Sequence, residues 1–170
     1  MNNDSVERLR DHVAPCSLLC YTCPGYREGA VAACARTMCR YFEGYCEFNE
    51  ASLPAEHRGL LPEMESFRKK LRQYAVGRCD GCRKKHSGDA GSPKGCVVTS
   101  CVREHRVDYC GECPEFPCGK TEGVFKEKQL RAWLEGNRRI KEIGVGKYFE
   151  EKKDVSHYID YAPAAGRMDT

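Results

Sequence analysis

Residues 16–23 read Cys-Ser-Leu-Leu-Cys-Tyr-Thr-Cys, so three thiols lie within eight residues near the start of the chain. Two more runs follow further along the sequence, and together the three runs hold ten of the 13 cysteines in 170 residues. The ten are Cys16, Cys20, Cys23, Cys79, Cys82, Cys96, Cys101, Cys110, Cys113 and Cys118. Such a density indicates either a disulfide scaffold or thiolate metal sites.

The N-terminal residues favour metal over disulfides. The run from Met1 to Val13 carries five charges and lacks the apolar stretch of about 7–15 residues that a secretory signal needs. No window approaches the ~18 consecutive apolar residues of a membrane span. We therefore expect a cytoplasmic protein without a membrane partner, whose thiols stay reduced and serve as metal ligands.

The composition indicates a thin apolar core. Leu, Ile, Val and Phe number 29 of the 170 residues, a share close to that of disordered chains. Metal ligation is the natural source of the missing stability, since a structural zinc site contributes on the order of 10 kcal/mol to folding. The formal net charge of +3 is too small to demand a polyanionic partner.

Three helices are predicted from apolar periodicity. The first follows Pro24, runs from about residue 31 to residue 42 and stops at Gly44. The second spans 60–77, with an apolar stripe from Leu60 to Tyr74. The third spans about 124–143, with Thr121 as its cap, and after Gly144 and Gly146 a short turn covers 147–153. Between these helices, residues 78–120 show no periodicity and read as a loop that needs its cysteines ligated.

Two motifs carry the strongest chemical signal. Residues 79–82 read Cys-Asp-Gly-Cys and residues 110–113 read Cys-Gly-Glu-Cys. Two intervening residues let a tight turn place both sulfurs about 2.3 Å from one tetrahedral zinc. Because the two motifs lie further apart than in a simple four-cysteine site, either the loop is enlarged or each motif is completed by other cysteines.

The first cysteine run leaves the metal open. Three close thiols followed by Pro24 suit three zinc ligands or one corner of a 4Fe–4S cluster. The same spacing occurs in radical enzymes that use S-adenosylmethionine, but these need a barrel of about 200 residues or more. Since no repeated strands are predicted, we set that class aside.

Taken together, these motifs resemble a prokaryotic family of cysteine-rich proteins known as a domain of unknown function. The resemblance covers roughly residues 14–153 and includes the stretch from Tyr109 to Cys118 and the stretch from Ile143 to Tyr148. It implies metal binding, commonly supposed to be zinc, with no reaction assigned. Ser17 stands where the family tends to have glycine, which affects the turn of the loop rather than the thiols.

The remaining candidates are fewer. Cys34 is predicted to be a small core residue. Cys46 could complete the first site if Gly44 ends its helix. Cys39 is a further possible ligand, but it lies about 10 Å from Cys46 along an unbroken helix, too far to share one metal ion with it. His105, which falls among the cysteines, is a further possible ligand; the other four histidines are expected to be solvated.

One basic run deserves a separate interpretation. Residues 68–85 carry Arg68, Lys69, Lys70, Arg72, Arg78, Arg83, Lys84 and Lys85, opposed only by Asp80. Such a run could contact phosphates, although a solvated helix face is commoner. No catalytic pattern of any class is found, so we name no catalytic residue and expect a protein that is not an enzyme.

The sequence thus predicts a small, metal-stabilised, mainly α fold with a loop-rich, cysteine-ligated core. A single domain covers 1–153, made of the first cysteines and helix (14–47), a helix (60–77), the loop-rich segment (78–120) and the C-terminal helices (121–153), with an irregular tail at 154–170. The expected function is a zinc-binding module with two or three ions that contacts another protein. The alternatives are an iron–sulfur protein for electron transfer or for assisting an anaerobic enzyme, and a zinc-ribbon-like nucleic-acid binder.

Overall fold

A computed structural model describes residues 9–84, 96–156 and 158–161 of the chain. Over these ranges the fold is helical, without a strand, and has only two isolated bridges, Val13 to Leu19 and Tyr26 to Cys79. The mainly α prediction is therefore confirmed. Those parts of the predicted domain and tail that fall in 1–8, 85–95 and 162–170 lie outside the described residues.

The helices differ widely in length. Residues 9–12 are helical at the start of the described chain. The elements after them are η1 (Cys20–Thr22), α2 (Ala30–Tyr41), α3 (Tyr45–Ser52), η2 (Ala55–Leu60), α4 (Leu61–Val76), α5 (Val97–Glu104), η3 (Cys110–Glu112), η4 (Gly119–Thr121), α6 (Glu127–Lys152) and η5 (Ile159–Tyr161).

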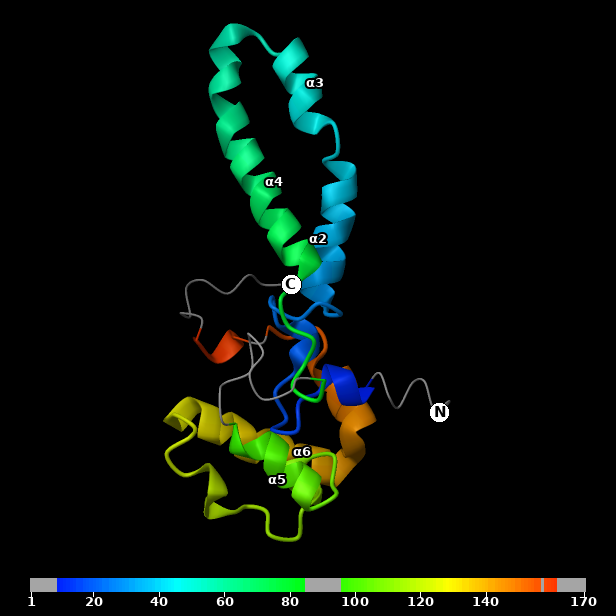
Figure 1. The fold of residues 1–170 in the computed structure, drawn as a ribbon, viewed down its shortest axis with the longest axis vertical. Helices are drawn as coiled ribbons and strands as arrows, with labels where there is room; N and C mark the ends of the chain where they lie inside the picture. Colours follow the sequence, from blue (N-terminus) through cyan, green and yellow to red (C-terminus); the bar gives the residue numbers. More distant parts are fainter. Residues whose placement is uncertain (1–8, 85–95, 157, 162–170) are drawn as a thin grey trace.

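Helices α2, α3 and α4 form a hairpin, residues 30–76, that extends from the rest of the molecule (Figure 1). α2 and α4 confirm the first two predicted helices, whereas α3 was not predicted. Gly44 has a φ of 76°, in the left-handed region that glycine tolerates. α2 already ends at Tyr41, and Gly44 precedes α3, which begins at the next residue.

The hairpin buries little of its apolar surface. The buried side of α2 carries Ala32 and Ala35, and α4 buries its own Leu71. Cys34 is exposed, so its prediction as a core residue was wrong; it lies one helical step away from Ala35, and the two alanines take the buried positions. The apolar stripe of α4 is also half-open, since Leu60 remains 60% exposed.

We call residues 9–29, 77–84 and 96–156 the body. Here α5 corrects the prediction of a loop over all of 78–120. It is only two turns long and begins with β-branched residues, but Val98 and Val102, four apart, bury one face. The predicted loop over 85–95 lies outside the described residues.

α6 confirms the third predicted helix, with a corrected start. It begins at Glu127, where the Gln129 side chain accepts a hydrogen bond from the Lys126 N–H (3.0 Å). Thr121 is buried in η4 and is not its cap. Gly144, at φ 80°, kinks the helix where the sequence predicted a break.

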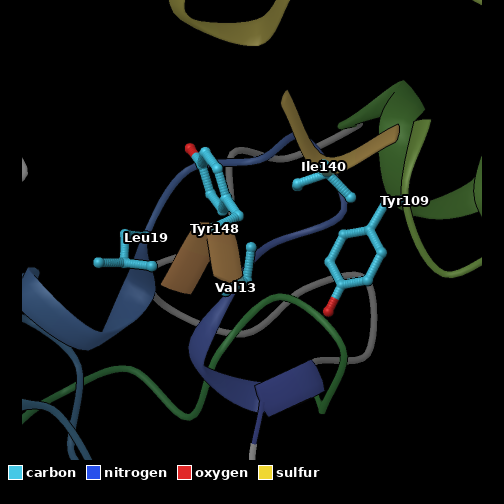
Figure 2. Packing of buried hydrophobic residues seen from close by; sticks show 5 residues of the cluster. All are labelled: Val13, Leu19, Tyr109, Ile140 and Tyr148. Atoms are coloured by element: carbon cyan, nitrogen blue, oxygen red, sulfur yellow. The ribbon is translucent and has the colours of Figure 1, made fainter. Parts of the chain in front are cut away.

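The apolar core of the body joins segments far apart in sequence. Val13, Leu19, Tyr109, Ile140 and Tyr148 are buried against one another, as Figure 2 shows. They come from the N-terminal loop, the entry to η3 and both halves of α6.

Two buried hydrogen bonds fix α6 against these loops. The Tyr148 hydroxyl donates to the Ser17 carbonyl (2.9 Å), and the Gly111 N–H donates to Asn137 Oδ1 (2.9 Å). The approach is close, since a Cβ on Gly111 would lie 2.3 Å from the Asn137 carbonyl oxygen. Glycine in this Cys-Gly-Glu-Cys motif is thus required by contact with α6.

Candidate metal centre

The N-terminal thiols are positioned by a loop that folds back on the Cys79 segment. Cys79 N–H donates to the Gly25 carbonyl and its carbonyl accepts from the Arg27 N–H, both at 2.9 Å. Ser17 adopts a φ of 68°, the left-handed conformation that favours glycine. The position at which the family resemblance implied glycine is thus one whose backbone suits it.

Four thiols gather where these segments meet: Cys16, Cys20, Cys79 and Cys82, which we call the first thiol group. A hydrogen bond with Cys82, followed by burial, raises the pKa of the Cys20 thiol well above its ordinary range. Burial raises the pKa of Cys16 to about 12, and Cys82, Cys96 and Cys110 add to the rise. Burial and the neighbouring sulfurs disfavour the ionised, thiolate form of these cysteines. A bound cation would favour that form.

Four other cysteines line one small cavity in the body. They are Cys101 from α5, Cys110 from η3, Cys113 and Cys118, and we call them the second thiol group. The cavity measures about 20 Å³, close to the size that holds one water molecule. It is closed on its apolar side by Val102, Val107 and Phe116.

Burial disfavours ionised sulfur in the second thiol group, and two polar groups partly oppose it. Burial raises the pKa of Cys110 to about 11, and the Trp133 indole N–H acts in the opposite direction. That indole nitrogen is buried and has no hydrogen-bond partner within the part of the chain that the structure describes. Burial also raises the pKa of Cys101, against which Lys120 acts with its Nζ 3.8 Å from the sulfur.

His105 lies at the same cavity. Its Nδ1 is 2.9 Å from the Cys101 carbonyl oxygen and 3.7 Å from the Cys101 sulfur, and its Nε2 is 3.4 Å from Glu115. The first of these contacts engages the nitrogen that points toward the thiols. His105 is therefore positioned as a neighbour of the second thiol group.

Both groups have the donor chemistry of zinc sites, but neither has ligation geometry. Among the described residues, no three or more His, Cys, Asp or Glu side chains converge as they would on a metal ion. The fit rests on other observations: four soft donors at a cavity of one-ion size, and an unpaired indole donor beside one of them. The second thiol group therefore offers the donor set of one zinc ion, without the convergent geometry of a bound one.

The other predicted thiols lie elsewhere. Cys23 has the Tyr158 hydroxyl 3.9 Å from its sulfur, and Cys96 lies near Cys16 at the start of α5. Cys39 lines a groove on the hairpin, and Cys46 on α3 contacts Arg68. α3 lies at the end of the hairpin remote from the body (Figure 1), so the fold does not bring Cys46 to the first thiol group.

Parts of the basic run are engaged internally. Arg68, whose side chain is 8% exposed, pairs with Glu47 (3.3 Å) and Glu65 (3.2 Å). Arg83 lies 4.9 Å from the centre of the Tyr109 ring and donates to the Asp108 carbonyl. Lys85 lies outside the described residues. Arg68 is therefore ion-paired and largely buried, and Arg83 is held against Tyr109 and Asp108.

Sequence reasoning missed Trp133 and Lys120 as neighbours of the sulfurs. Trp133 is on the predicted face of its helix, but nothing in that pattern indicates that its N–H faces Cys110. Lys120 had one usable signal, its position two residues after Cys118.

In the described part of the chain, no helix is both long and apolar enough to cross a bilayer.

Comparison with known proteins identifies a family but no individual relative. No curated protein and no solved structure matches the chain. The family model described as DUF3795, protein of unknown function, matches residues 12–123, a segment that contains both thiol groups and the hairpin. With two thirds of its length inside that match, the chain belongs to the DUF3795 family.

Proposed function

We propose that this protein binds zinc through two sites of four thiolates each and that the ions stabilise the body, from which the hairpin extends to contact another protein. The observation that carries the proposal is the cavity of about 20 Å³ lined by four cysteines. Zinc would supply a fixed tetrahedral cross-link there, with no part in a reaction. Reduced thiols suit the cytoplasm, which we propose as its location.

The second thiol group draws its four cysteines from three segments. Cys101 lies on α5, Cys110 begins η3 and Cys113 follows it, and Cys118 precedes η4. A metal held by all four would close loops of different lengths. It would thereby lower the conformational entropy of the unfolded chain and stabilise the body. Trp133 would donate its indole N–H to the Cys110 thiolate and so hold charge on that sulfur.

Metal analysis of anaerobically purified protein tests the proposal. We expect two zinc ions per chain and no colour, and Cys113→Ser should lower the count to one. Cys34→Ser is the matched control, because Cys34 is exposed on α2, and it should retain both ions. A chain that holds no metal under these conditions would refute the proposal.

An iron–sulfur cluster is the second candidate, for the first thiol group only. Cys96 lies near this group in addition to its four members, and Cys23 belongs to the same loop as Cys16 and Cys20. This number of thiols exceeds what one zinc needs and would suit a 4Fe–4S cluster. Brown protein with iron and sulfide, bleached by Cys20→Ser but not by Cys113→Ser, would establish the cluster and exclude zinc at this group.

A further inference from the structure

We infer that the groove between α2 and α4 is a docking site for an acidic amphipathic helix of another protein. The inference deepens the protein-contact part of the proposed function and does not depend on the metal. The groove has a volume of about 700 Å³ and is lined by Ala33, Arg36, Thr37, Cys39, Arg40, Arg72, Ala75 and Val76. Most of it lies on one face of each helix, at i, i+3, i+4 and i+7 of α2 and at i, i+3 and i+4 of α4.

The floor of the groove is apolar and is formed largely by small side chains. Ala33 and Ala75 are small, so a third helix can approach the backbones of α2 and α4 closely. Val76 is 66% exposed, an unusual position for a branched apolar side chain beside two alanines. An incoming helix with leucines at every third or fourth position would cover this floor.

The rim of the groove is basic. Arg36, Arg40 and Arg72 line it, and no acidic side chain does. None of the three forms an ion pair with a carboxylate among the described residues. Arg36 donates to the Arg27 and Ala75 carbonyls (both 3.1 Å) and Arg40 donates to Thr37 (3.2 Å).

Two carboxylates lie near this rim without forming an ion pair with it. Glu43 shares a neighbouring pocket with Arg40 and Arg72. A backbone hydrogen bond, then Arg68 and last Arg72 lower the pKa of Glu47, whose ion pair is with Arg68. Charge complementarity therefore selects glutamate or aspartate on the partner, placed on either side of its apolar stripe. An amphipathic helix with acidic flanks satisfies both the floor and the rim.

The surrounding surface extends the same preference. Tyr41, the last residue of α2, and Phe48 on α3 are 82% and 68% exposed. Aromatic side chains with this exposure are enriched at protein contacts. They give a longer partner additional apolar contacts beyond the groove itself.

Binding of a labelled synthetic helix tests the inference. The probe is a fluorescein-labelled peptide of about 15 residues with leucines on one face and glutamates on both flanks. Its controls are the same peptide with lysine for glutamate, and one with serine for leucine. The metal content of the full-length protein is measured first, and binding is followed by fluorescence anisotropy. We expect only the glutamate–leucine peptide to bind.

Matched substitutions on the same helix locate the site. Arg72→Glu should weaken binding about tenfold, since it removes one charge contact and introduces a repulsive one. Lys70→Glu makes the same charge change on α4 away from the groove and should alter affinity less than about twofold. Val76→Ser should weaken binding by removing apolar floor, whereas Tyr41→Ser, outside the groove, should have a smaller effect.

The outcomes separate the two proposals. Zinc-loaded protein that ignores the peptide, binds the lysine peptide equally, or responds to Lys70→Glu as strongly as to Arg72→Glu would overturn the groove. Self-association by sedimentation, lost in Arg72→Glu, would assign the groove to a second copy and overturn it too. So would displacement of the peptide by an oligonucleotide at low concentration. Metal-free protein that binds the peptide would instead refute only the zinc sites.

Discussion

The body and the hairpin of this molecule are stabilised in different ways. In the body, Val13, Tyr109 and Ile140 are at most 3% exposed, and hydrogen bonds such as that from Cys110 N–H to the Pro15 carbonyl join distant segments. In the hairpin, buried side chains are few, and Tyr41 and Phe48 remain open to solvent. The body is thus built of non-local contacts around sulfur, and the hairpin of neighbouring helices with an uncovered surface.

This contrast shows that the clustered cysteines and most of the exposed apolar side chains lie in different parts of the chain. Eight of the ten clustered thiols lie in the two thiol groups of the body. The large exposed apolar side chains gather on the hairpin instead. The body thus combines the eight grouped thiols with the buried apolar core, whereas the hairpin, with Cys34, Cys39 and Cys46 apart from both groups, leaves much of its apolar surface open to a partner.

Removing the metal should produce the largest difference between the two regions. Chelation under anaerobic conditions should destabilise the body by an amount on the order of 10 kcal/mol. Amide hydrogen exchange measures this: protection at Tyr109 and Ile140 should collapse, while that of α2 and α4 changes less. Protein freed of all metal with unchanged protection at Ile140 would contradict the prediction.

Gly111→Ala should have the next largest effect, again in the body. The added Cβ would lie 2.3 Å from the Asn137 carbonyl oxygen, and backbone must move to relieve the clash, at about 3 kcal/mol. Denaturant unfolding measures the loss. Gly59→Ala in the hairpin is the control, because no atom lies within 4 Å of its added Cβ; equal losses in the two variants would disprove this account of Gly111.

Tyr148→Phe should destabilise the body by about 1–2 kcal/mol, because it leaves the buried Ser17 carbonyl without its donor. Burial raises the pKa of the Tyr148 hydroxyl to about 12, so it remains a donor at neutral pH. Thermal unfolding at fixed metal content reports the change. Tyr41→Phe, at an 82% exposed position, should change nothing measurable, and a comparable loss there would count against the contrast.

Gly44→Ala should have the smallest effect, and in the hairpin. The added Cβ contacts nothing within 4 Å, so only the left-handed backbone opposes it, at roughly 1 kcal/mol. Local hydrogen exchange in α2 and α3 should rise while the body is unaffected. A fall in metal content in this variant would contradict the prediction, because it would show that a change in the hairpin is transmitted to the body.

Sequence reasoning succeeded where one physical rule acts locally. α2, α4 and the kink at Gly144 follow from apolar spacing and glycine. It failed at α5, whose two turns are stabilised by burial of Val98 and Val102 in a site assembled from distant residues. It failed at Cys34 because helical periodicity identifies a stripe but does not decide which edge of it a neighbour covers.

The candidate site shows the same limit. The ten clustered cysteines were identified from spacing, yet how they divide follows from long-range packing. Cys110 and Cys113 lie with Cys101 and Cys118, and Cys79 and Cys82 lie with Cys16 and Cys20. This is the second of the two arrangements that the spacing left open. Whether these groups hold metal stays a prediction.

The bond between the Tyr148 hydroxyl and the Ser17 carbonyl spans 131 residues of sequence. On the ribosome, residue 17 emerges long before residue 148, so the N-terminal loop must wait for almost the whole chain before it is fixed. Contacts of such separation slow folding and prolong the exposure of unpaired groups. During that interval the thiols of Cys16, Cys20 and Cys23 are accessible to oxidants, so the order of synthesis sets how long they remain unprotected.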